Sequence, residues 1–300
     1  MTAATTNRYD RYPTRSNVKI GIAPRHDPAV WCDPDRVSGP LETRLVDRFD
    51  ADGFVTVDAL VDPDIVADLR AELDNLRTDP ALAQDERSVL EPDSREIRSI
   101  FEVHKVSPAF GALVADPRLV GPVRQLLGSD VYVHQSRVNF KPGFNGQEFY
   151  WHSDFETWHA EDGMPSPRAI SVSVALTENR DYNGSLMIMP GSHKWFVSCP
   201  GETPPEHYRS SLRRQEIGTP DETSLTWLAN ERGIRQITGP AGSAVFFDSN
   251  CMHGSSSNIT PYPRSNVFIV YNSVENTLVE PFGAKAPRPT FIASRTFDPV

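Results

Sequence analysis

The sequence predicts an α+β protein built on a β-barrel or jelly roll. Helical periodicity governs its first half, and a period of two governs much of the second. The chain has 300 residues, of which 38% are apolar, so it can bury a substantial core and is not a wholly disordered protein. We expect residues 1–40 to form an extended, proline-rich N-terminal arm and residues 41–300 to form a single domain.

Two segments carry the helical pattern. Asp62 is a candidate N-cap, and Pro63 would occupy the first helical position, where a missing N–H costs nothing. The face that follows is apolar, through Ile65, Val66, Leu69, Leu73 and Leu76. A second pattern covers residues 107–127 and ends before Gly128.

From residue 130 onward, the alternation of apolar and polar residues predicts strands. They cover residues 130–141, 169–176, 186–189, 243–247 and 266–274. Turn signals such as Asn183-Gly184 separate them. Residues 200–232 are predicted to form a polar, partly helical insertion between strands.

The composition excludes several classes of protein. A formal net charge of −10 lacks the basic footprint of a nucleic-acid-binding protein. No apolar run approaches the length of about 20 residues that spans a bilayer, and the first residues do not resemble a secretory signal. Three widely separated cysteines do not suggest a disulfide framework, so we expect a protein of the cytoplasm.

Two histidines and one aspartate are candidate metal ligands. His152 and Asp154 are two residues apart, so on a strand their side chains would project from the same face. His253, which follows the predicted strand 243–247, is the best third ligand. Two histidines and a carboxylate are the ligand set of non-heme Fe(II) oxygenases, because three coordination positions stay open for a 2-oxo acid and dioxygen. The alternative is a surface strand that carries two polar residues.

Basic and amide side chains support the oxygenase interpretation. Arg264 stands eleven residues after His253, where its guanidinium could clamp the far carboxylate of 2-oxoglutarate. It could also be an ordinary strand-end charge in water. One face of strand 130–141 carries polar residues in succession, either as a solvated outer face or as the lining of a polar cavity. These residues are Gln135, Arg137, Asn139 and Lys141.

A long block around the candidate ligands resembles a known family. Residues 149–165, which read FYWHSDFETWHAEDGMP, resemble the signature of the ectoine hydroxylases. These enzymes belong to the phytanoyl-CoA dioxygenase-like branch of the Fe(II)/2-oxoglutarate-dependent oxygenases. The resemblance extends over nearly the whole chain, through residues 95–105, 131–137, 186–194, 251–254 and 263–270. A small departure is Asn139-Phe140, where a smaller aliphatic residue is expected after the asparagine.

The resemblance implies a fold, a reaction and a set of site residues. The fold would be a double-stranded β-helix (a cupin-like jelly roll) flanked by helices, in a homodimer. The reaction would hydroxylate the compatible solute ectoine to 5-hydroxyectoine, with release of succinate and carbon dioxide, as part of the response to osmotic or heat stress. By position, the iron ligands would be His152, Asp154 and His253. The 2-oxoglutarate residues would be Lys141, Arg264, Asn139 and Ser171. The ectoine residues would be Gln135, Thr157, Trp158, Phe247, Asn266 and Phe268.

These residue types suit ectoine, a small zwitterion with a flat cationic ring, because aromatic faces attract cations and amides satisfy a polar rim. Two alternatives stay open. The chain could be an oxygenase of the same branch acting on another small zwitterionic or amino-acid-like substrate. It could also be a jelly-roll binding protein whose triad is unused or holds zinc.

Overall fold

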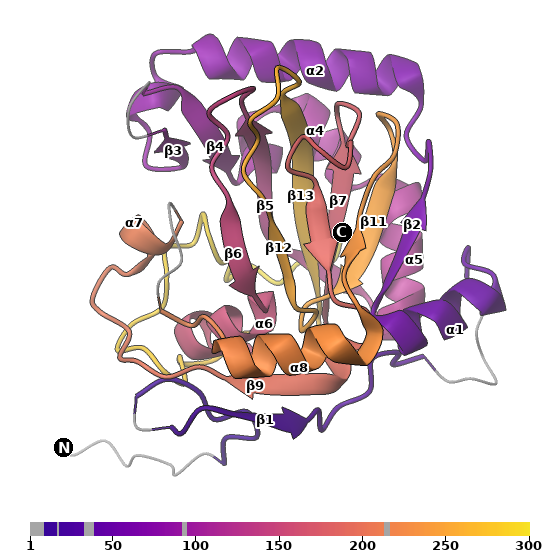
Figure 1. Cartoon of the computed structure of the whole chain (residues 1–300). Coiled ribbons are helices and arrows are strands. Elements are labelled where there is room, and N and C mark those ends of the chain that lie inside the picture. The colour runs from indigo at the N-terminus through magenta and orange to yellow at the C-terminus, as the bar shows by residue number, and fades with distance from the viewer. Residues whose placement is uncertain (1–8, 17, 33–38, 92–94, 213–216) are drawn as a thin grey trace.

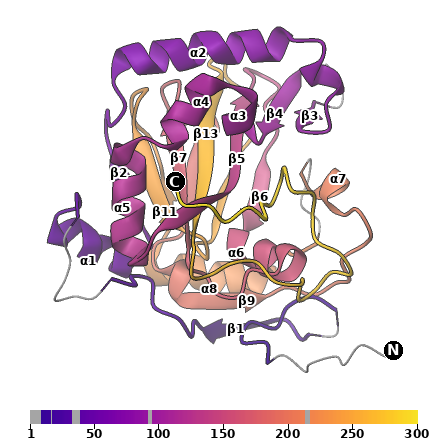
Figure 2. The ribbon, with the colours of Figure 1, turned by 180° about the vertical axis from the view of Figure 1, so that it is seen from behind.

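The structure is a computed structural model, and it describes residues 9–16, 18–32, 39–91, 95–212 and 217–300. Within these residues, two antiparallel sheets face each other, and helices cover the outer side of the larger sheet (Figures 1 and 2). The α+β jelly roll that the sequence predicts is therefore confirmed.

The larger sheet forms the rear wall of the jelly roll in the view of Figure 1. Its strands in spatial order are β2 (Phe54–Val57), β11 (Ala244–Asp248), β7 (Ala169–Ala175), β13 (Arg264–Ser273), β5 (Val131–Lys141), β4 (Ile97–Phe101) and β3 (Ser88–Leu90). The central strands β13 and β5 pair from Arg264 opposite Lys141 to Ser273 opposite Val131. Each has a hydrogen-bonded neighbour on both edges, which makes this part of the sheet a firm platform.

The smaller sheet lies in front of the larger one (Figure 1). Its strands are β10 (Arg235–Gln236), β8 (Leu186–Ile188), β12 (His253–Ser255) and β6 (Phe149–His152). Below both sheets, β1 (Gly21–Pro24) pairs with β9 (Trp195–Ser198) (Figure 1). All five strands predicted from the alternating pattern are confirmed, with ends that shift by one or two residues.

The helices α4 (Pro108–Val114) and α5 (Pro117–Leu127) lie against the outer face of the larger sheet, and α2 (Pro63–Thr78) crosses its upper end and contacts α4 (Figure 2). The remaining helices and helical turns are α1 (Thr43–Asp52), η2 (Leu82–Gln84), α3 (Val103–Val106), α6 (Asp154–Thr157), η3 (Trp158–Asp162), η4 (Ser192–Lys194), α7 (Tyr208–Ser211) and α8 (Glu222–Arg232). In the described part of the chain, none of the helices combines the length and apolarity that a membrane crossing requires.

Both predicted helical segments are confirmed, with refinements. Pro63 is the first residue of α2, but the Asp62 side chain makes no capping bond and instead accepts a hydrogen bond from Arg118. The predicted apolar face is buried except for Ile65, which is exposed. The second segment divides into α4 and α5, because the Asp116 side chain caps α5 by accepting the Arg118 backbone N–H at 2.8 Å.

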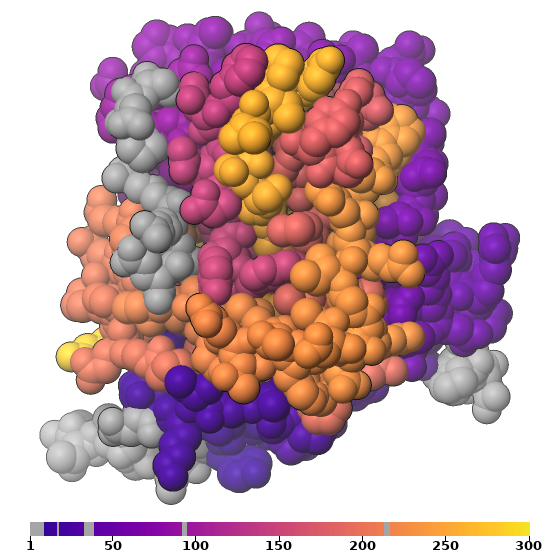
Figure 3. Space-filling view, in the orientation of Figure 1, coloured from indigo at the N-terminus to yellow at the C-terminus, as the bar shows by residue number. Residues whose placement is uncertain are grey.

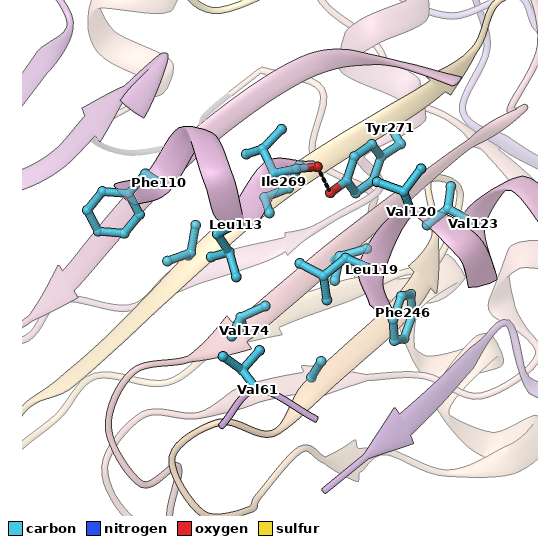
Figure 4. Packing of buried hydrophobic residues seen from close by; sticks show 14 of the residues in the cluster. Val61, Phe110, Leu113, Leu119, Val120, Val123, Val174, Phe246, Ile269 and Tyr271 are labelled. Carbon is cyan, nitrogen blue, oxygen red and sulfur yellow. Dashed lines mark hydrogen bonds between the residues drawn. The ribbon is translucent and has the colours of Figure 1, made fainter. Parts of the chain in front are cut away.

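The main hydrophobic core lies between these helices and the larger sheet (Figure 4). Leu113 and Leu119 come from the helices, whereas Val174, Phe246 and Ile269 come from the strands. Burial of such side chains stabilises the fold by roughly 1.5–3 kcal/mol each. The core therefore fixes the platform, and it leaves the opposite face of the sheet available for polar groups.

A β-bulge in β5 changes which residues face the interior. Gln135 pairs with Val270, but the next pair is Val133 with Tyr271, so His134 is an extra residue. Val133 consequently packs on the helix side with the core, while Gln135 lies on the interior side. Strict alternation along strand 130–141 would put Val133 and Gln135 on the same face, and the bulge places them on opposite faces.

Candidate metal centre

His152, Asp154 and His253 converge between the two sheets. His152 is the last residue of β6 and His253 the first of β12, and the two are directly opposite in the register. The Asp154 carboxylate lies 3.6 Å from His152 Nε2 and 3.9 Å from His253 Nε2. All three residues are buried, and one potential ligand atom from each lies within 4.8 Å of the others. This spacing suits a single bound metal ion.

The route by which Asp154 reaches this position differs from the prediction. The sequence analysis placed His152 and Asp154 on one strand, but β6 ends at His152 and Asp154 begins helix α6. The chain leaves the sheet there because the Phe155 N–H donates to Ser249 O at 2.8 Å. Ser171 Oγ then donates to Asp154 Oδ2 at 3.1 Å, which holds the carboxylate in place.

The protonation of the triad favours metal binding. His152 Nδ1 lies 2.8 Å from Tyr150 O and His253 Nδ1 lies 3.0 Å from Cys251 O. A carbonyl oxygen only accepts, so each Nδ1 carries a proton and each Nε2 offers its lone pair to the metal. Burial, aided by His152, lowers the pKa of His253 to about 4, which keeps this imidazole neutral. Burial opposes ionisation of Asp154, but His253, His152 and Arg137 hold its pKa below the usual range.

A cationic cavity adjoins the triad. Lys141 and Arg264 are paired across β5 and β13, and both line it with Asn139 and Phe268. Among the described residues, the hydrogen-bond partners of both cations are neutral. Lys141 Nζ donates to Ser256 O at 2.6 Å and to Ser255 Oγ at 3.0 Å, and Arg264 donates to Asn266 Oδ1. Burial, together with Arg264, lowers the pKa of Lys141 to about 6, and burial lowers the pKa of Arg264 to about 10. Such a cavity favours an anionic ligand, and Arg264 is not the solvated strand-end charge of the alternative interpretation.

A second cavity meets the first at Arg137, Phe149 and His152. It carries charges of both signs and the aromatic side chains of Phe149 and Trp158. Its lining also includes Gln135, Asp154, Thr157, Glu161, His207 and Arg288. Arg288 forms a bidentate pair with Asp162, with distances of 2.8 and 2.6 Å. Arg137 donates to Gln135 Oε1 at 3.2 Å, while its Nε has no partner within the protein as described.

The structure does not bring every predicted site residue to a cavity wall. Ser171 contacts Asp154, as described above. Phe247 packs edge-on against His253 with ring centres 5.0 Å apart. Asn266 accepts from Arg264 and donates to Ser173 Oγ, so it lies beside the cationic cavity.

Sequence reasoning gave no site role to four residues of the second cavity. Arg137 was recognisable as part of the polar face of β5, although it was not assigned to a ligand. Arg288, between two prolines near the C-terminus, follows no periodic pattern. Glu161 and His207, whose side chains are 2.9 Å apart, come from segments 46 residues apart, and no local signal joins them.

The triad with open coordination positions, held in a jelly roll, defines the class of non-heme metal oxygenases. The chain belongs to the phytanoyl-CoA dioxygenase (PhyH) family, whose model matches residues 49–266.

Several relatives are similar over their whole length. An ectoine dioxygenase of Streptomyces coelicolor is 60% identical, and the match covers 100% of both chains. An ectoine dioxygenase of Bordetella bronchiseptica is 54% identical over 95% of this chain and 92% of its own. The crystal structure of EctD from S. alaskensis with 2-oxoglutarate and 5-hydroxyectoine is 47% identical, with a TM-score of 0.87 over 97% of this chain and 96% of that one. The same enzyme has also been solved with bound Fe.

Proposed function

We propose that this chain is an Fe(II)- and 2-oxoglutarate-dependent dioxygenase that hydroxylates ectoine. One ectoine, one 2-oxoglutarate and one dioxygen are consumed, and 5-hydroxyectoine, succinate and carbon dioxide are formed. The observation that carries the proposal is the convergence of His152, Asp154 and His253 between a cationic cavity and a cavity of mixed charge. The full-length identity of 60% to an ectoine dioxygenase supports this substrate.

His152, Asp154 and His253 are the proposed iron ligands, because two imidazoles and one carboxylate form the facial set that this chemistry uses. Bound Fe(II) would supply the activation of dioxygen, with the electrons that 2-oxoglutarate releases on decarboxylation. The Asp154 carboxylate offsets part of the metal charge in a buried site. Its contact with Ser171 favours a role for that serine in orienting the ligand rather than in binding 2-oxoglutarate directly.

Lys141 and Arg264 are the proposed binding groups for the far carboxylate of 2-oxoglutarate. Their neighbouring positions in the register present two cations to one anion, and Arg264 can bind it in bidentate geometry. Asn139, which accepts a hydrogen bond from Ser99 at 2.8 Å, lines the same cavity. A dicarboxylate bound there would have one end free to reach the metal.

The second cavity is the proposed ectoine site. Arg137 and Arg288 can bind the ectoine carboxylate, while the face of Trp158 attracts the flat cationic ring. Gln135 and Thr157 supply polar contacts at the same wall. Of the other predicted ectoine residues, Phe268 lies under the Arg137 guanidinium, 5.1 Å from Cζ to the ring centre, whereas Phe247 lies against His253 and Asn266 beside the cationic cavity. Held in this way, the ring presents one C–H bond to the metal, and burial excludes water from it.

The test is incubation of the protein with Fe(II), 2-oxoglutarate, ascorbate and ectoine, followed by chromatography. We expect 5-hydroxyectoine and succinate in equal amounts, and no product when Zn(II) replaces Fe(II). A panel of other small zwitterions, such as proline and glycine betaine, serves as the control. Succinate formation that depends on a panel member and not on ectoine would reassign the substrate, and product with Zn(II) would contradict the metal assignment.

We also propose that residues 41–300 act as one catalytic domain with residues 1–40 as its arm. The homodimer, the cytoplasmic location and the part in osmotic or heat stress belong to the same proposal, and they rest on the similarity to ectoine dioxygenases. Light scattering of the purified full-length chain tests the homodimer, for which we expect twice the mass of 33.4 kDa.

A further inference from the structure

Two arginines of the N-terminal arm are buried, although the arm runs along the outside of the jelly roll. Residues 9–16 and 18–32 of the arm follow the lower edge of the molecule below β9 and α8 (Figures 1 and 3). The side chain of Arg15 is 0% exposed and that of Arg25 is 3% exposed. Burying a guanidinium is costly unless it is paired, so the partners of these two residues are informative.

Arg15 binds the helix that carries the aspartate ligand. Its Nε and Nη2 donate to the two carboxylate oxygens of Glu156 at 2.6 and 2.8 Å. Thr14 Oγ1 donates to the same carboxylate at 2.6 Å. Glu156 lies two residues after Asp154 on the single turn of α6, so the arm holds this turn by three hydrogen bonds.

The surroundings of Arg15 are built to fit it. Its φ of 67° is in the left-handed region, which costs energy for a residue other than glycine, and its N–H donates to Cys199 O at 2.8 Å. A Cβ atom at Gly218 would lie only 2.2 Å from Arg15 Nη2, and a Cβ at Gly283 would crowd its stem. The chain thus leaves space for this guanidinium at two separate glycines.

Arg25 binds the segment that leads to the second histidine ligand. Its Nη1 donates to Asp248 Oδ2 at 2.7 Å, and its Nη2 donates to Pro167 O at 2.8 Å. Asp248 ends β11, and its other carboxylate oxygen accepts the Asn250 N–H at 2.8 Å. The turn from Asp248 runs directly to His253, so the arm holds the beginning of this turn as well.

The two ligand segments also bind each other between these anchors. The Phe155 N–H donates to Ser249 O, and Ser153 Oγ donates to Asn250 Oδ1 at 3.1 Å. Residues on either side of Asp154 therefore contact the turn before His253. Arg15 binds one of these segments and Arg25 binds the other, so two residues ten positions apart in the arm hold both sides of the contact.

We infer that Arg15 and Arg25 are positioning residues that set the separation of Asp154 and His253, acting through Glu156 and Asp248. The arm is in this sense part of the metal centre, even though the contacts of Arg15 and Arg25 are with neighbours of the metal ligands and not with the ligands themselves. The inference rests on the proposed function for its link to hydroxylation. Its prediction for metal affinity holds whichever substrate the enzyme takes.

The experiment replaces each ion pair by neutral residues of similar size. One variant combines Arg15→Met with Glu156→Gln, and the other combines Arg25→Met with Asp248→Asn, so that neither member of each pair is left charged alone. The first variant also removes the 3.4 Å contact of Arg15 with Glu161, which keeps its contact with His207 Nδ1 at 2.9 Å. The matched control is Arg11→Met, which removes an ion pair of the same arm with Asp27 (3.1 Å), where Arg11 is 55% exposed. Each protein is examined for its melting temperature, its Fe(II) affinity under anaerobic conditions, and the ratio of succinate to hydroxylated product.

We expect both double variants to fold and to bind Fe(II) at least about tenfold more weakly, as loss of supporting contacts around metal ligands typically causes. We also expect succinate to exceed hydroxylated product in them, while the control keeps the values of the parent protein. If a double variant fails to fold, Arg15→Lys or Arg25→Lys keeps the charge and loses the fork of the guanidinium, and the same weakening is expected. Unchanged Fe(II) affinity and an unchanged product ratio, whatever the melting temperature, would overturn the inference. Absence of ectoine turnover in the parent protein would contradict the proposed function alone, because the comparison of Fe(II) affinities still stands.

Discussion

The two faces of strand β13 differ completely in what they carry. On the helix side the strand presents apolar residues to the core, namely Val267, Ile269 and Tyr271. On the interior side it presents functional groups to the cationic cavity or its surroundings, namely Arg264, Asn266 and Phe268. One strand thus joins the main hydrophobic core to the cationic cavity.

Alternate residues of β13 therefore serve different ends: those on the helix side contribute to stability, and those on the interior side to ligand binding. The helix side gains free energy from burial, whereas the interior side contains cations whose burial is unfavourable until an anion binds. Arg264 and Lys141 have their pKa values lowered by burial for this reason. Substitutions on the interior side are therefore expected to affect ligands first, and substitutions on the helix side to affect unfolding first.

The largest expected effect comes from the metal ligands. His152→Ala should lower turnover by at least about a thousandfold, because a bound metal supplies several kcal/mol to the reaction. Product formation measured by chromatography checks this. The control is His104→Gln. His104 belongs to α3 and contacts Ser136 on the helix side of β5, so this variant should keep turnover within about threefold of the parent protein. Normal hydroxylation by His152→Ala would overturn the ligand assignment.

Removal of the cosubstrate clamp should act selectively. Arg264→Ala should raise the KM for 2-oxoglutarate about a hundredfold, because truncating one partner of a buried charge pair costs about 2–5 kcal/mol. The KM for ectoine should change far less, since its proposed site is the adjoining cavity. Steady-state kinetics with each substrate varied gives both values, and equal changes in the two would argue against the clamp.

The neighbouring helix side should behave in the opposite way. Ile269→Ala removes a side chain that is 0% exposed, so it should lower the free energy of unfolding by about 2–5 kcal/mol. Urea denaturation measures this loss. Both KM values should stay within about twofold, because the substitution creates its cavity away from the ligands. A large rise in either KM would show that the two faces are not independent.

A smaller effect on the same face should follow from Tyr271→Phe. The Tyr271 hydroxyl donates to Val114 O at 2.8 Å inside the core (Figure 4). Its removal should cost about 1–2 kcal/mol of unfolding free energy, because the carbonyl loses its partner without access to water. Urea denaturation of both variants compares the loss of one buried hydrogen bond with the loss of one buried side chain. A larger loss of unfolding free energy in Tyr271→Phe than in Ile269→Ala would contradict the importance given to packing.

The smallest signal concerns a proton. Burial lowers the pKa of Lys141 to about 6, so at pH 8 its amine is mostly neutral when the cavity is empty. A bound carboxylate favours the ammonium form of Lys141 and raises its pKa. Binding of 2-oxoglutarate at pH 8 should therefore be coupled to uptake of close to one proton by Lys141, and the affinity for 2-oxoglutarate should fall as the pH rises further. Calorimetry of the anaerobic Fe(II) protein in two buffers of different ionisation enthalpy measures the uptake. Lys141→Met should abolish it, and equal uptake in both proteins would rule out Lys141 as the source.

Local patterns predicted much of this arrangement. The alternation in residues 266–274 predicted β13, because the two faces of this strand carry opposite chemistry. Pro63 likewise indicated the start of α2. Asp154 was predicted to lie near His152, but on a strand, because the hydrogen bond of Phe155 to Ser249 that ends β6 comes from 94 residues away. The bulge at His134 could not be predicted from the sequence either, because it is defined by the pairing of β5 with β13.

The contacts least accessible to sequence reasoning are those of the arm. Arg15 and Glu156 are 141 residues apart, and nothing in the proline-rich segment distinguishes Arg15 from the exposed Arg11. The charges of Arg137 and Arg288 in the second cavity likewise depend on which sheet face and which C-terminal segment meet there. Long-range pairing of charges follows from the completed fold and not from local propensity.

Anaerobic titration of the protein with Fe(II) in the presence of 2-oxoglutarate tests the central claim most directly, with the metal-to-ligand charge-transfer absorption as the signal. The account predicts that the band saturates at one Fe(II) per chain, disappears in His253→Ala, and needs far more 2-oxoglutarate in Arg264→Ala. A full band in His253→Ala, or no band in the parent protein, would contradict it.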